Sequence, residues 1–99
     1  MMDSGGCVYI LTNKTNTVLY TGVTSDLYVR MIEHKEKYFP GSFSAKYHCN
    51  KLIYFEQHSS IIDAIGREKQ IKNWKREWKI NVINAMNPEW NDLFETTEL

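Results

Sequence analysis

The fold is decided by residues 7–24, which read CVYILTNKTNTVLYTGVT. Both ends of this stretch, residues 7–12 and 17–24, are rich in β-branched and aromatic residues, which favour extended strands. The four residues between them, Asn13-Lys14-Thr15-Asn16, have the composition of a turn. The pattern therefore predicts two antiparallel strands joined as a β-hairpin.

This hairpin brings two tyrosines together. A turn centred between Lys14 and Thr15 would place Tyr9 directly opposite Tyr20 on one face of the sheet, with their Cβ atoms about 5 Å apart. A one-residue slip of the register would separate them, because it moves one of them to the other face. Such a pair is most often part of a hydrophobic core, and a catalytic pair is the alternative interpretation.

The rest of the chain is predicted to add three helices and one strand. In chain order these are a helix capped by Thr24, Ser25 or Asp26 and ending near Lys37, a polar loop to about Asn50, a strand at 51–57, a helix at 61–73 capped by Ser60, and a helix ending at Asn87-Pro88. The order β-β-α-β-α-α predicts an α+β domain. We expect Trp90, Leu93 and Phe94 to dock the C-terminal segment on this domain.

Length and composition indicate one globular domain. The chain has 99 residues, 42% of them hydrophobic and 24% charged, and it lacks the run of about 18 apolar residues that a membrane span needs. We expect residues 1–6 to form a flexible N-terminus without a secretion signal, 7–94 to form the domain and 95–99 to form an acidic tail. Cys7 and Cys49 make no disulfide framework, which predicts a reducing, cytoplasmic setting.

Charge is distributed unevenly, although the formal net charge is zero. Residues 30–79 hold eleven Lys or Arg against six Asp or Glu, a balance of +5, whereas residues 89–99 hold four acids and no base. A basic body of this kind can present a phosphate-binding face. An ordinary solvated surface explains the same pattern, so charge alone leaves nucleic-acid binding open.

Arg30 and His34 share a face of the first predicted helix, because they are four residues apart. An arginine can grip phosphate oxygens with its forked guanidinium. A neutral histidine can accept a proton near pH 7. A solvent-facing, charged helix edge is the alternative interpretation of the pair.

Glu68 is the least expected residue of its helix. It follows Ala64 by four residues and precedes Ile71 by three, so it lies within the apolar stripe that should face the core. Burying a lone carboxylate is unfavourable unless it is paired or binds a cation. A metal ion would supply that cation, and a buried salt bridge to Arg30 or Arg67 is the alternative.

These residues stand in motifs that resemble those of the GIY-YIG nuclease superfamily, in particular its small stand-alone bacterial members. The Gly-Ile-Tyr signature of that family corresponds to Cys7-Val8-Tyr9, and its Tyr-Ile-Gly signature to Tyr20-Thr21-Gly22. Residues 27–35, LYVRMIEHK, resemble its arginine helix, and residues 64–72, AIGREKQIK, resemble the helix that carries its metal-binding glutamate. The similarity covers roughly residues 7–92.

The resemblance implies a three-stranded antiparallel sheet flanked by helices. It also implies hydrolysis of a phosphodiester bond in nucleic acid with one Mg²⁺ or Mn²⁺ ion. We expect DNA rather than RNA as the substrate, although the residues themselves do not distinguish the two. By resemblance, Tyr9 acts as general base or orients the attacking water, Tyr20 supports the phosphate or the nucleophile, Arg30 stabilises negative charge, His34 assists proton transfer and Glu68 holds the metal. One carboxylate can be enough for Mg²⁺, which keeps several waters and takes substrate phosphate as a ligand. Further candidate contacts to nucleic acid are Gly22, Lys35, Lys46, Lys69, Lys72 and Asn81.

Two positions depart from the family pattern, since Cys7 replaces the leading glycine and Thr21 replaces the central isoleucine. The two tyrosines and Gly22 are retained, so we expect the site to be retained too. The family also often places a late asparagine near the phosphate. Asn81, Asn84 and Asn87 are the candidates, and the position of Asn81 on the Trp74/Trp78 side of its helix favours it slightly.

A non-catalytic nucleic-acid-binding module with the same fold is the main alternative. Its phosphate contacts would come from Lys46, Lys69, Lys72, Lys75, Arg76 and Lys79, and its base contacts from Tyr28, Tyr38 or Tyr47.

A zinc module is disfavoured, because the cysteines and histidines lack zinc-ligand spacing. A partner-binding role for the three tryptophans is explained more simply by core packing. No separate DNA-binding domain fits in this length, so we expect structure-selective cleavage or a protein partner that supplies targeting.

Overall fold

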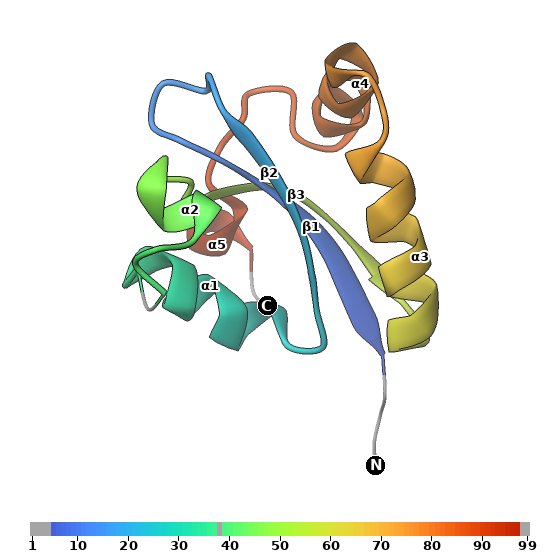
Figure 1. The fold of residues 1–99 in the computed structure, drawn as a ribbon. Coiled ribbons are helices and arrows are strands. Elements are labelled where there is room, and N and C mark those ends of the chain that lie inside the picture. Colours follow the sequence, from blue (N-terminus) through green and yellow to red (C-terminus); the bar gives the residue numbers. More distant parts are fainter. Residues whose placement is uncertain (1–4, 38, 98–99) are drawn as a thin grey trace.

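Three strands form one antiparallel sheet, in which β1 (Gly6–Thr12) lies between β2 (Leu19–Thr24) and β3 (Lys51–His58). In the computed structural model, which describes residues 5–37 and 39–97, helices cover both faces of this sheet. On one face lie α1 (Leu27–Lys35), α2 (Phe43–Lys46) and α5 (Leu93–Thr96), and on the other lie α3 (Ile61–Lys72) and α4 (Arg76–Met86) (Figure 1). The predicted α+β fold and its antiparallel sheet are confirmed.

Two one-turn helices add to the predicted elements. Helix α2 falls in the expected polar loop, where the Ser42 side chain accepts a hydrogen bond from the Ala45 backbone N–H. Helix α5 begins in the same way at Asp92. Helices this short show no 3.6-residue periodicity, so the sequence pattern does not predict them. None of the helices among the described residues has the length and apolar character needed to cross a membrane.

Strand β1 begins at Gly6, the last residue of the segment that is predicted to be flexible. Gly6 is buried in this strand. Residues 1–4 of that segment lie outside the described residues. In the predicted acidic tail, residues 95 and 96 belong to α5, and residues 98–99 are not described.

Strand β1 is buried along its whole length, because helices pack on both faces of the sheet. Successive side chains of a strand point to opposite faces. Val8 and Ile10 therefore join a cluster with residues of α3 and α4, whereas Tyr9 and Leu11 join a cluster with Met31 of α1. This alternation places Tyr9 on the α1 face of the sheet and keeps α3 on the opposite face.

The register of the hairpin differs from the prediction by two residues. Tyr9 pairs with Gly22, and Leu11 pairs with Tyr20. The connection is longer than a tight turn, because the Asn13 side chain accepts hydrogen bonds from the backbone N–H groups of Thr17 and Val18, at 2.8 and 3.1 Å. A shift of two residues keeps every side chain on its face. The two tyrosines are therefore not directly opposite, but they still share the α1 face.

Candidate active site

Tyr9 lies on the central strand, and its side chain is fully buried on the α1 face of the sheet. Its partner on β2 is Gly22. A Cβ atom at position 22 would lie 2.5 Å from both the Cζ and the Oη atoms of Tyr9. Glycine therefore leaves the room that the Tyr9 ring needs. This packing explains Gly22 without any contact to phosphate.

His34 connects Tyr9 to helix α2. It lies in the last turn of α1, where its Nε2 atom is 2.8 Å from Tyr9 Oη and its Nδ1 atom is 2.9 Å from Ser44 Oγ. The ring of Tyr20 meets the His34 ring edge-on, with centroids 5.6 Å apart. Ser44 is buried and is a functional candidate that the sequence does not single out. Its contact with His34 is tertiary, and its surrounding segment has no informative periodicity.

Burial and charge set the protonation states of these groups. Burial, followed by the positive charge of Arg30, lowers the pKa of His34 from 6.5 to about 4. Burial is also the main reason why the pKa of Tyr9 is raised above its usual value of 10. At neutral pH the imidazole is therefore neutral and the Tyr9 phenol keeps its proton. With the imidazole proton on Nδ1, His34 donates to Ser44 and accepts from Tyr9, and the other tautomer reverses both bonds.

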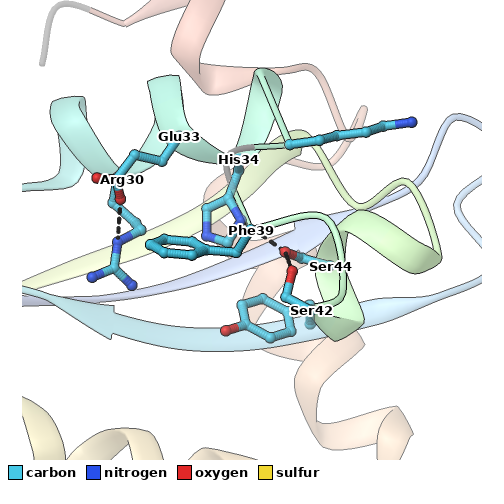
Figure 2. Close-up of a pocket in the computed structure, with 8 residues that line it drawn as sticks. Arg30, Glu33, His34, Phe39, Ser42 and Ser44 are labelled. Atoms are coloured by element: carbon cyan, nitrogen blue, oxygen red, sulfur yellow. Dashed lines mark hydrogen bonds and ion pairs between the residues drawn. The ribbon is translucent and has the colours of Figure 1, made fainter.

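Arg30 and His34 project from α1 into one pocket, which is shown in Figure 2. This pocket has a volume of about 110 Å³ and is also lined by Tyr20, Glu33, Lys37, Phe39, Ser42 and Ser44. The Arg30 Nε atom is 3.0 Å from the Glu33 carboxylate, and the Arg30 side chain is 38% exposed. The ion pair uses Nε, so the other guanidinium nitrogens can interact with the Tyr9 phenol, as Arg30 does here, and with an anion. The pocket thus combines an arginine, a phenol and a neutral imidazole.

Glu68 is 8% exposed and lies on the buried side of α3 with Ala64 and Ile71, as the apolar stripe predicts. Its carboxylate is 2.7 Å from Lys72 Nζ, one helical turn later. The two salt bridges considered from the sequence, to Arg30 or Arg67, are therefore wrong. Arg67 pairs with Glu56 on β3, with Arg67 Nε 2.9 Å from the carboxylate. Lys72 satisfies Glu68 because the i, i+4 spacing holds the two side chains together.

The glutamate and the tyrosines come from opposite faces of the sheet. Helix α3 packs on one face of the sheet and helix α1 on the other, with β1 and β2 between them (Figure 1). Tyr20 lies between the two sides, because it lines the Arg30 pocket and also lines a second hollow together with Lys72, the partner of Glu68. Within the ranges that the structure describes, no three His, Cys, Asp or Glu side chains lie close enough to hold a metal ion together.

A family model described as the GIY-YIG catalytic domain matches residues 5–81. The chain belongs to the GIY-YIG family. It is 37% identical over 86 residues to a UPF0213 protein of Syntrophus aciditrophicus (strain SB), covering 83% of this chain and 92% of that protein. It is 35% identical over 80 residues to a UPF0213 protein of Staphylococcus haemolyticus (strain JCSC1435), covering 77% of this chain and 90% of that protein.

A solved structure supports the same fold. The solution NMR structure of a UPF0213 protein from Bacillus halodurans is similar to this chain, with a TM-score of 0.56 and 20% sequence identity. The similarity covers 96% of this chain and 99% of that one. The resemblance of the motifs to the GIY-YIG family is thus confirmed, and so is the fold that it implies.

The other residues of this GIY-YIG domain that are predicted to contact nucleic acid do not line the Arg30 pocket. Lys35 is used inside the structure, where its Nζ atom donates to the Asn50 carbonyl at 2.9 Å and to the Asp92 carboxylate at 2.8 Å. Lys46 and Lys69 are exposed, and Lys46 Nζ lies 5.6 Å from the centre of the Tyr47 ring. Tyr28 is also exposed, and Tyr38 lies outside the described residues.

The late asparagines differ in their surroundings. Asn81 lies on the Trp78 side of α4, as predicted, but that side faces outward, since both residues are exposed. Asn84 accepts a hydrogen bond from the Trp90 indole at 2.7 Å. Asn87 is buried and its amide donates to the carbonyl of Ile53 on β3. Trp90 and Asn87 thus hold the C-terminal segment, and the structure brings none of these asparagines to the Arg30 pocket.

Proposed function

We propose that this chain is a divalent-metal-dependent endonuclease that hydrolyses phosphodiester bonds in nucleic acid, DNA rather than RNA. The observation that carries the proposal is the hydrogen-bonded chain Tyr9–His34–Ser44 beside Arg30. A neutral imidazole bonded to a phenol can receive a proton, and an adjacent guanidinium can bind the phosphate whose ester is cleaved. Tyr9, Arg30 and His34 also stand in the motifs that resemble those of the GIY-YIG family, whose model matches residues 5–81.

In this mechanism Arg30 and Tyr20 meet the phosphate first, because both line the open pocket. The Tyr9 oxygen takes a proton from the attacking water as its own proton passes to His34 Nε2. This transfer avoids a free phenolate, which the raised pKa of Tyr9 makes unfavourable at neutral pH. The pKa of His34 is lowered to about 4 without substrate, so the negative charge of the bound phosphate is needed to stabilise the imidazolium that forms. Ser44 holds the ring in the orientation that leaves Nε2 facing Tyr9. Tyr9 is covered in this structure, so water reaches its oxygen only when a pocket side chain turns aside.

The metal part of the proposal rests on Glu68. Its carboxylate is a hard oxygen donor, nearly buried and balanced by a single lysine, and such a donor suits Mg²⁺ or Mn²⁺. One protein ligand fits an ion whose remaining ligands are waters and substrate phosphate. When bound, the ion would supply positive charge that stabilises the phosphoryl oxygens. Lys72 would then be released from Glu68.

The proposal also covers how the cleavage site is selected and in which compartment the protein acts. We expect cleavage to be structure-selective or to be directed by a protein partner. We also expect the protein to act in a reducing cytoplasm, and both cysteines, Cys7 and Cys49, are buried free thiols, which is compatible with this.

The test is cleavage of labelled duplex, single-stranded, flapped and branched DNA and of RNA, in Mg²⁺, in Mn²⁺ and in EDTA. Wild type should cut, and EDTA, Tyr9→Phe or Glu68→Gln should abolish cutting. Glu36→Gln removes the same charge at an exposed position of the α1 C-cap and should cut normally. Binding without cutting in every condition would favour the non-catalytic module, for which the pairing of Glu68 with Lys72 is the supporting observation.

A further inference from the structure

A second hollow lies on the other side of Tyr20, beside the edge strand β2. Its volume is about 320 Å³, and its lining residues are Leu19, Tyr20, Thr21, Phe43, Lys72 and Lys79. Lys72 comes from the end of α3 and Lys79 from α4. Arg76 lies one turn before Lys79 on α4, and its Nη2 atom donates to the Thr17 carbonyl before β2 at 3.1 Å. We call Lys72, Arg76 and Lys79 the basic cluster.

The basic cluster carries more positive charge than its surroundings balance. Partial burial, followed by the charges of Arg76 and Lys72, lowers the pKa of Lys79. Glu68 pairs with Lys72, but in the part of the chain that the structure describes no ion pair engages Arg76 or Lys79. Binding of an anion would reduce the electrostatic repulsion between these positive charges.

The hollow also has an aromatic wall. Phe43 is 49% exposed and its ring stacks on Tyr20, with centroids 6.0 Å apart and an interplanar angle of 24°. Tyr20 lines both this hollow and the pocket of Arg30. An extended polyanion that crosses the β2 edge at Tyr20 would therefore meet Arg30 on one side and Lys79 on the other.

We propose that the basic cluster is a backbone-phosphate subsite for the nucleotide next to the cleaved bond, with Phe43 against the adjoining sugar or base. The inference rests on the proposed function, because it takes the Arg30 pocket as the place of cleavage. In this proposal Arg76 and Lys79 bind phosphate. Lys35, which the sequence suggested for phosphate binding, does not, because it forms an ion pair with Asp92. Contacts of this kind position the strand and carry no sequence information.

The experiment is binding of fluorescein-labelled single-stranded and duplex DNA in EDTA, followed by anisotropy over a range of salt concentrations. The variant is Lys79→Gln, and the matched control is Lys51→Gln on β3, the opposite edge strand. Loss of one phosphate contact should weaken binding of whichever DNA form occupies the site and reduce the slope of log affinity against log salt by about 1. The Lys51→Gln slope should equal that of wild type.

Thermal unfolding without DNA gives a second readout. Lys79→Gln should unfold at or above the wild-type temperature, because the substitution removes repulsion from Lys72 and Arg76. An unchanged salt slope in Lys79→Gln, or equal losses in both variants, would overturn the subsite. The binding assay needs no cleavage, so a slope change without nuclease activity supports phosphate binding by the basic cluster but rejects both the proposed function and a place for the cluster beside a cleaved bond. If wild type cleaves DNA but the Lys79→Gln salt slope is unchanged, the proposed function is supported and the subsite is rejected.

Discussion

Gly22→Ala tests whether the packing of Tyr9 against β2 sets the position of the Tyr9 phenol, to which we assign a catalytic role in the proposed function. The added Cβ atom would lie 2.5 Å from Cζ and Oη of Tyr9 and 3.0 Å from Cε1, whereas ordinary contacts are 3.4–4 Å. Either the ring or the strand must therefore move by about 1 Å, since neither atom is the end of a flexible chain. That movement would disturb the 2.8 Å hydrogen bond between Tyr9 Oη and His34 Nε2.

The expected magnitudes follow from this overlap. Overpacking of a buried site costs about 1–3 kcal/mol of unfolding free energy. For a domain of this size each kcal/mol lowers the unfolding temperature by roughly 4–8 °C. A reacting group displaced by about 1 Å can lose on the order of 100-fold in rate.

The assays are thermal unfolding by circular dichroism and cleavage of the best substrate from the panel. Gly66→Ala is the control, because a Cβ atom at this exposed position of α3 meets nothing within 4 Å. It should raise stability, by up to about 1 kcal/mol, since alanine favours helix. If Gly22→Ala unfolds and cuts like wild type, the argument that glycine makes room for Tyr9 is refuted.

Three further predictions concern side chains around the site and the C-terminal segment. Ser44→Ala should lower kcat about tenfold with little change in KM, because the lost bond to His34 Nδ1 is worth about 1.4 kcal/mol; unchanged ¹⁵N shifts of the imidazole would contradict this. Asn87→Ala should lower the free energy of unfolding by about 1–3 kcal/mol in urea without slowing cleavage, because it leaves the Ile53 carbonyl unpaired. Wild type should lose stability as pH falls from 6.5 to about 4, because the unfolded state protonates His34 there and the folded state does not. His34→Gln should lose less over that window, and an equal loss would place the pH dependence elsewhere.

Local sequence pattern determined much of the fold and part of the site. The hairpin predicted from residues 7–24 places Tyr9 and Tyr20 on one face of the sheet, and the four-residue spacing of Arg30 and His34 predicts a shared face of α1. Both hold, because these relations depend only on the geometry of a strand and a helix. The buried position of Glu68 was predictable for the same reason.

Other features depended on contacts between segments that are distant in sequence or on the conformation of a loop. The hairpin register followed from hydrogen bonds of the Asn13 side chain, which lengthened the connection by an even number of residues and so left the tyrosines on one face. The pairing of His34 with Ser44 arose because α2 packs beside α1, although no periodicity marks α2.

The sequence by itself therefore determined which residues face inward and which share a face, since side-chain direction repeats with the backbone. Only the tertiary structure decided which partners they meet. It committed Lys35 to Asp92, joined His34 to Ser44, and placed Gly22 under the Tyr9 ring. The physical reason is that periodicity is a local property of the chain, whereas distances between elements depend on how the whole core packs.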